Sequence, residues 1–83
     1  MNTLQSAISV LMADRDTFAR NLVKLRNKRG LNQEELAFLV GVHRTMITNY
    51  ECRKHSPKFE NLAKIAEVLG VTVDELLAES PPE

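Results

Sequence analysis

The sequence predicts an all-α protein: a compact domain of five short helices with one extra helix in front of it. Apolar residues recur at helical spacing, three or four positions apart, along most of the chain. Polar cap residues precede several of these stretches, and Gly30, Gly41 and Gly70 follow three of them. A chain of 83 residues with 43% hydrophobic content makes one domain. At this size it buries only about 60% of its unfolded surface, which leaves little room for a ligand cavity.

The first expected helix lies in an N-terminal extension, residues 1–15. Its apolar residues fall on one helical face: Leu4, Ala7, Ile8, Leu11 and Met12. Residues 14–16 then offer an N-terminal cap for a separate second helix over residues 16–28, which Gly30 ends. The domain proper is expected to run over residues 16–79.

Two short helices follow, and they carry most of the functional argument. Asn32 caps the first of them, and Gly41 supplies the positive φ that ends it. The second starts near His43 or Arg44 and extends to Glu51. Their inward faces comprise Leu36, Ala37 and Val40 in the first helix, and Ile47 and Tyr50 with Met46 at the margin in the second. Two helices that cross over such a short turn can place one helix in a groove of DNA.

The C-terminal part is expected to hold two more helices. Ser56-Pro57 marks the start of the first, and Gly70 follows its end. The buried stripe of this helix is expected to be Phe59, Leu62, Ile65, Ala66 and Leu69. A last helix spans residues 74–77 with Thr72 as its cap, and residues 80–83 are expected to be a disordered tail.

Charge is distributed unevenly along a chain whose net charge is zero. Residues 20–58 contain nine Lys and Arg against three acids, which gives +6, whereas residues 59–83 contain one Lys against six acids, which gives −5. A zero net charge argues against a nucleic-acid partner, but this distribution centres the positive charge on the two short helices. The acidic end is expected to face away from DNA.

The ordered set of residues from Phe18 to Leu77 resembles the Xre/Cro/repressor type of bacterial and phage helix-turn-helix proteins. The residues that carry the resemblance are Arg26, Gly30-Leu31-Asn32-Gln33-Glu34-Glu35-Leu36-Ala37, Gly41-Val42, Ile47, Tyr50-Glu51, Pro57, Leu62-Ala63-Lys64-Ile65-Ala66, Leu69-Gly70-Val71 and Glu75-Leu76-Leu77. No single dipeptide among them is specific, but their order and spacing are. The resemblance implies a phage-repressor-like fold and binding to double-stranded DNA.

Functional residues follow from this resemblance. The positions that reach base edges in relatives correspond to Arg44, Thr45, Thr48 and Asn49. The expected phosphate contacts are Asn32 and Gln33 at their helix start, His43, and the basic residues Arg53, Lys54 and Lys58. Arg26 and Glu51 correspond to a partly buried structural ion pair. Its alternative is two solvated surface charges.

Three features depart from the pattern of the family. Most relatives have glycine at the position of Arg53, so either Arg53 adopts a left-handed conformation or the loop takes a different course. Cys52 is expected to be a plain, partly buried thiol, with a redox switch as the alternative. Phe38 and Leu39 stand where relatives carry polar residues, and we expect the extra N-terminal helix to cover them, within one subunit or from a dimer mate. The alternative is a frayed tail beside two incidental surface hydrophobes.

These features predict a sequence-specific transcriptional regulator, a dimeric repressor that reads the major groove with the helix around residues 43–51. The dimer surface is expected to involve either Val73, Leu76 and Leu77 in the last helix or the N-terminal extension. A DNA-binding antitoxin or a restriction-modification controller is the first alternative, and a protein-interaction adaptor that does not read DNA is the second. No catalytic arrangement, metal-ligand cluster or cofactor motif is evident, so the chain is not expected to be an enzyme. No membrane span or signal peptide is evident either, and the cytoplasm is the expected location.

Overall fold

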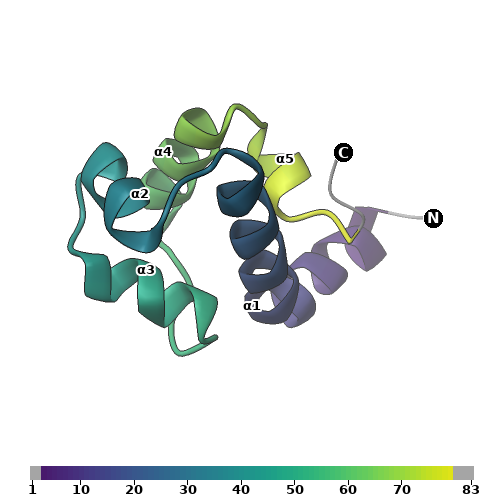
Figure 1. Ribbon diagram of the computed structural model, residues 1–83. Helices are drawn as coiled ribbons and strands as arrows, with labels where there is room; N and C mark the ends of the chain where they lie inside the picture. The colour runs from purple at the N-terminus through teal and green to yellow at the C-terminus, as the bar shows by residue number, and fades with distance from the viewer. Residues whose placement is uncertain (1–2, 80–83) are drawn as a thin grey trace.

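The computed structural model describes the backbone of residues 3–79 and the side chains of residues 15–79. Within this part of the chain every regular element is a helix (Figure 1). The helices are α1 (Thr3–Lys28), α2 (Gln33–Val40), α3 (Arg44–Glu51), α4 (Phe59–Leu69) and α5 (Val73–Leu76). The all-α prediction is confirmed. The tail expected at residues 80–83 lies outside the described residues.

Helix α1 is continuous, and the break predicted at residues 14–16 is wrong. The extension is helical as expected, but Asp16 lies inside the helix and not at its start. Neither glycine nor proline occurs between Thr3 and Lys28, so nothing in the backbone interrupts the helical hydrogen bonding. The division of the chain into residues 1–15 and 16–79 stays a prediction.

A single apolar core lies between the helices. It contains Phe18, Leu22 and Leu25 from α1, Leu36, Ala37 and Val40 from α2, Ile47 and Tyr50 from α3, Leu62, Ile65, Ala66 and Leu69 from α4, and Leu76 from α5. The rings of Phe18 and Tyr50 meet edge to face with their centroids 5.9 Å apart. The prediction that Phe59 belongs to the buried stripe of α4 is wrong. Phe59 is 73% exposed because it is the first residue of the helix and lies beyond the core.

Phe38 and Leu39 are also exposed on the outer side of α2, by 82% and 48%. The prediction that the N-terminal extension covers them within one subunit is therefore wrong. The N-terminal turns of α1, purple in Figure 1, lie on the side of the molecule away from α2. The alternative, that the N-terminal extension of a second copy of the chain covers Phe38 and Leu39, stays a prediction.

The helix ends follow the sequence closely, with one exception. Asn32 and Thr72 each form a capping box, with Glu35 and Glu75 respectively. The exception is the start of α4. Pro57 was expected in the first turn, but the helix begins two residues later, after Lys58, which makes no side-chain cap.

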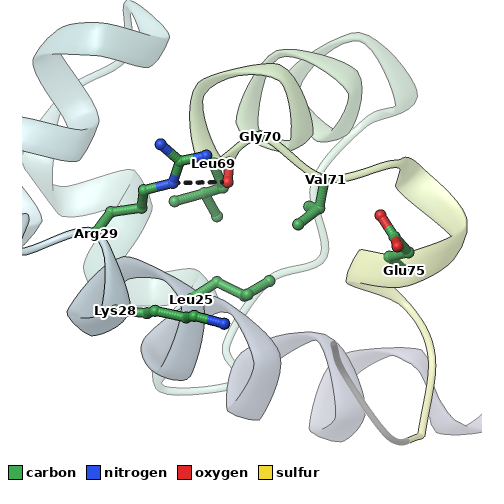
Figure 2. A pocket seen from close by; sticks show the side chains of 7 residues that line it. All are labelled: Leu25, Lys28, Arg29, Leu69, Gly70, Val71 and Glu75. Atoms are coloured by element: carbon green, nitrogen blue, oxygen red, sulfur yellow. Dashed lines mark hydrogen bonds between the residues drawn. The ribbon is translucent and has the colours of Figure 1, made fainter. Parts of the chain in front are cut away.

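Two polar contacts tie α1 to the C-terminal helices. Asn21 is buried, and its Nδ2 donates to the carbonyl oxygens of Leu76 and Ala78, each at 2.7 Å. Just after the end of α1, Arg29 reaches over the end of α4, and its Nε donates to the carbonyl oxygen of Leu69 at 3.0 Å (Figure 2). A cation at this end of a helix also interacts favourably with the helix dipole. The C-terminal helices are thereby fixed to the helix that supports α3.

Candidate nucleic-acid interface

Helix α3 presents one apolar and one polar face. Ile47 and Tyr50 are buried against the other helices, and Ile47 is fully covered. Arg44 and Thr45 at the start of the helix are exposed, whereas Thr48 and Asn49 are half-buried. A helix with one face embedded in the core has a fixed position, so its outward side chains are presented at a fixed angle to any partner.

The predicted ion pair between Arg26 and Glu51 is present and largely buried. Nε and Nη2 of Arg26 donate to the two carboxylate oxygens of Glu51 at 2.6 and 3.1 Å. Their side chains are 12% and 7% exposed, so the alternative of two solvated charges is wrong. Nη1 of Arg26 also donates to the carbonyl oxygen of Leu31 at 2.8 Å. The pair therefore connects α1, the loop before α2 and the last residue of α3.

Gln33 adds a contact that the sequence did not reveal. Its Nε2 donates to Oε1 of Glu51 at 2.8 Å, and its Oε1 accepts from the hydroxyl of Thr48 at 2.9 Å. The side chain expected to meet a phosphate thus faces α3. The backbone N–H of Gln33 keeps its place in the first turn of α2, where amides of a helix point toward an approaching anion.

Asn32 and His43 both cap helices while remaining exposed. Oδ1 of Asn32 accepts from the backbone N–H of Glu35 at 2.7 Å, a bond that does not involve its amide nitrogen. Nδ1 of His43 accepts from the backbone N–H of Thr45 at 3.1 Å, which leaves Nε2 as the outward nitrogen. Both residues can therefore stabilise their helix and still offer an N–H group to a phosphate.

Arg53, two residues after the end of α3, adopts the left-handed conformation with φ +65°, so the first of the two alternatives for this position is confirmed. The backbone N–H groups of Arg53 and Lys54 donate to the carbonyls of Tyr50 and Asn49, at 3.2 and 2.9 Å. These two bonds form the Schellman motif that usually has glycine at this position. The loop therefore keeps the familiar course with an arginine in place of glycine.

Asp16 holds the side chain of Arg53. Nε of Arg53 donates to Oδ1 of Asp16 at 2.6 Å, and Nη1 of Arg20 donates to Oδ2 at 2.6 Å. The hydrogen bond from Arg53 keeps the pKa of Asp16 below its ordinary value of 3.8, with a smaller effect from Arg20. Sequence reasoning missed this contact because 37 residues separate its partners. Only the spacing of Asp16 and Arg20, one helical turn apart, signalled a charge pair.

The other basic residues of this region, Lys54 and Lys58, are exposed in the segment between α3 and α4. Nearby, Nε of Arg15 donates to the hydroxyl of Ser56 at 3.2 Å.

Cys52 is exposed, so the expectation of a partly buried thiol is wrong. Among the described side chains, no three His, Cys, Asp or Glu come together to hold a metal ion. In the same part of the chain, no helix combines the length and hydropathy needed to cross a bilayer.

A helix-turn-helix family model matches residues 22–76, which include all of α2, α3 and α4. This chain belongs to the Xre-type helix-turn-helix family. The predicted resemblance is therefore confirmed.

Relatives within this family are regulators by name. The chain is 40% identical over 63 residues to the transcriptional repressor RstR of the cryptic phage CTXphi from Vibrio cholerae, an alignment that covers 76% of this chain and 57% of RstR. It is 33% identical to the control protein C.SmaI of Serratia marcescens, over 76% of this chain and 75% of that protein. These names agree with the expectation that the chain is not an enzyme. The chain spans about half the length of several relatives, RstR among them.

Solved structures give the same assignment. The hypothetical transcription factor NHTF from Neisseria superposes with a TM-score of 0.76 at 35% identity, over 83% of this chain and 77% of that chain. The restriction-modification controller C.AhdI from Aeromonas hydrophila superposes with a TM-score of 0.72 at 36% identity, over 77% of this chain and 97% of the controller. The fold around α2 and α3 is therefore that of known regulators.

Proposed function

We propose that this chain is a sequence-specific DNA-binding transcription regulator that inserts α3 into the major groove. The observation that carries the proposal is the rigid presentation of α3. Its apolar face is buried, and its last residue, Glu51, accepts hydrogen bonds from Arg26 and Gln33. A recognition helix held in this way presents its outward side chains in one register to the bases.

The outward residues of α3 have the chemistry that base reading requires. Arg44 can donate two hydrogen bonds to guanine, and Asn49 can form a bidentate pair with adenine. Thr45 and Thr48 add hydroxyl and methyl groups. Flanking contacts to phosphate would come from Asn32, Gln33, His43, Arg53, Lys54 and Lys58, which fix the register without reading sequence.

We propose that the regulator acts as a homodimer on two half-sites about one helical turn, roughly 34 Å, apart. Leu76 cannot contribute to the dimer surface because it is fully buried, which corrects that part of the expectation. A hollow along α4 is lined by the apolar residues Phe59, Ala63, Ala66, Val71 and Val73 and by the charged residues Glu60, Lys64 and Glu67. This surface at the start of α4 and α5 supports a C-terminal dimer contact.

A restriction-modification controller is the second candidate. The chain spans 75% of C.SmaI and 97% of C.AhdI, but only 57% of the repressor RstR. Similarity to two control proteins over most of their own length supports this candidate. Mapping the bound sites on the source genome separates the two, because a controller binds beside restriction and modification genes. Both roles require access to DNA, and we therefore propose that the protein acts in the cytoplasm.

Selection of duplexes from a random pool tests the proposal. The expected result is a palindromic site whose affinity falls steeply as salt rises. The quadruple variant Arg44→Ala, Thr45→Ala, Thr48→Ala and Asn49→Ala should lose this selectivity. The control Glu79→Ala, at an exposed side chain outside α3 and outside the proposed dimer surface, should keep it. Unchanged selectivity in the quadruple variant would overturn the proposal, and salt-insensitive binding without sequence preference would favour an adaptor.

A further inference from the structure

We infer that the Thr48 hydroxyl meets DNA as an acceptor only, and that it therefore reads a base with an exocyclic amino group, adenine or cytosine. The inference rests on the proposed function and specifies one of its base contacts. It depends on the direction of the hydrogen bonds that join Arg26, Glu51, Gln33 and Thr48.

The direction of each bond in this chain is set by the one before it. Glu51, paired with the guanidinium of Arg26 through both oxygens, is a carboxylate that only accepts. The atom of Gln33 that lies 2.8 Å from it must therefore be the amide nitrogen, because the carbonyl oxygen would face another acceptor. Oε1 of Gln33 then points toward Thr48.

Thr48 must give its proton to the protein. Its Oγ1 lies 2.9 Å from Oε1 of Gln33, which can only accept, and 3.2 Å from the carbonyl oxygen of Arg44, which also only accepts. A hydroxyl has one proton, so either bond uses the whole donor capacity of Thr48. What remains for a partner is a lone pair on a half-buried oxygen, together with the methyl group.

An acceptor in the major groove distinguishes the bases. Adenine N6 and cytosine N4 are donors there, whereas guanine O6 and N7 and thymine O4 are acceptors. The oxygen of Thr48 is attracted to the first pair and repelled by the second. Its neighbour Arg44 carries donors only and has the opposite preference. The two residues therefore read complementary base edges from one face of α3.

Selection from a random duplex pool with Thr48→Val tests the inference, because valine keeps the shape and the methyl group but has no lone pair. In the wild type, one position of each half-site should favour adenine or cytosine over guanine and thymine by about fivefold to tenfold, the worth of one hydrogen bond. Thr48→Val should flatten the preference at that position alone, and Thr48→Ser should retain it. Thr45→Val changes a neighbouring base-contact residue in the same way, and it should alter a different position of the half-site while the preference at the Thr48 position stays the same.

A second variant tests the role of Gln33. Gln33→Leu removes the nearer of the two acceptors for the Thr48 proton and leaves only the carbonyl oxygen of Arg44 at 3.2 Å, so the preference against guanine and thymine should weaken at the same position. An unchanged preference in this variant would overturn the assignment of the proton to Gln33. The inference is also overturned if Thr48→Val alters no position, or if the position that it alters favours guanine or thymine in the wild type. A wild type that selects no sequence at all would instead refute the proposed function.

Discussion

Replacing Glu51 with alanine should destabilise the protein strongly, although the residue lies at the end of a short helix. The change removes the acceptor for two bonds from Arg26 and one from Gln33. It leaves the guanidinium of Arg26, whose side chain is 12% exposed, without its counter-charge. Removal of one partner from a buried ion pair costs about 3–5 kcal/mol, far more than the pair contributes relative to apolar residues.

Urea unfolding followed by circular dichroism measures this effect. The free energy of unfolding should fall by about 3–5 kcal/mol, and each kcal/mol lowers the melting temperature by about 4–8 °C in a domain of this size. Arg26→Met should cost a comparable amount, because it leaves the carboxylate of Glu51 unpaired. Glu79→Ala is the control, since Glu79 is exposed and its contact with Arg20 is 3.9 Å long. It should change stability by less than about 0.5 kcal/mol.

The double variant Arg26→Met with Glu51→Ala, which combines the two single changes, separates the cost of an unpaired charge from the cost of losing each side chain. With both charges gone, no ion is left unpaired, so the double variant should be more stable than either single variant. A cost below about 1 kcal/mol for Glu51→Ala would refute the reasoning. So would costs that simply add in the double variant. Either result would mean that water reaches the guanidinium once its partner is removed.

Three further predictions concern helix ends and the loop after α3. Gly70→Ala should cost about 1–2 kcal/mol for its left-handed conformation, and more than Gly30→Ala, because the added Cβ would collide with Arg29 while nothing lies within 4 Å of the other site. Thermal unfolding of both variants measures the difference. Asp16→Asn should raise DNA affinity about fivefold by removing a charge that competes for Arg53. Arg53→Gly should not lower stability, because glycine adopts the left-handed conformation without strain, yet it should weaken DNA binding, with the salt slope reduced by about one.

Controls make these outcomes decisive. Asp74→Asn removes the same charge from the acidic C-terminal end, and it should raise affinity less than Asp16→Asn does. Equal gains in affinity from the two variants would mean that only the net charge of the protein matters.

The pKa of Asp16 is lowered in the folded protein, so its ion pair favours folding above pH 3.8 and this advantage is lost as the pH falls below 3.8. The stability difference between wild type and Asp16→Asn should therefore disappear in strong acid. If Gly70→Ala and Gly30→Ala have equal stability, the collision between the added Cβ at residue 70 and Arg29 does not destabilise the protein.

The sequence predicted what local chemistry encodes. Asn32 and Thr72 identified helix starts because their side chains can accept from the amides that a helix start leaves unpaired. Gly41 and Gly70 identified helix ends because each adopts a positive φ. Features that depend on distant parts of the chain could not be predicted, and the clearest is the bond between Arg53 and Asp16.

The same limit explains what the sequence pattern missed. Gln33 was expected to contact phosphate because of its position in the motif, and the pattern did not reveal that its side-chain amide bonds to the buried carboxylate of Glu51. Phe59 was expected in the core because it fits the apolar period, yet a period says nothing about where the core ends. The extra turns of α1 were expected as a separate helix because acids commonly cap helices. Asp14 and Asp16 are tolerated inside a helix when no glycine or proline breaks it.

The conformation of Arg53 indicates what its side chain is for. A left-handed residue with a Cβ costs about 1–2 kcal/mol that glycine would avoid. The ion pair with Asp16 offsets little of this cost, because both side chains are about half exposed and ion pairs at the surface contribute little to stability. Folding therefore gains nothing from arginine at this position. A guanidinium beside the end of the recognition helix gains its value where a phosphate can replace Asp16, so the strain in this loop supports a contact with DNA.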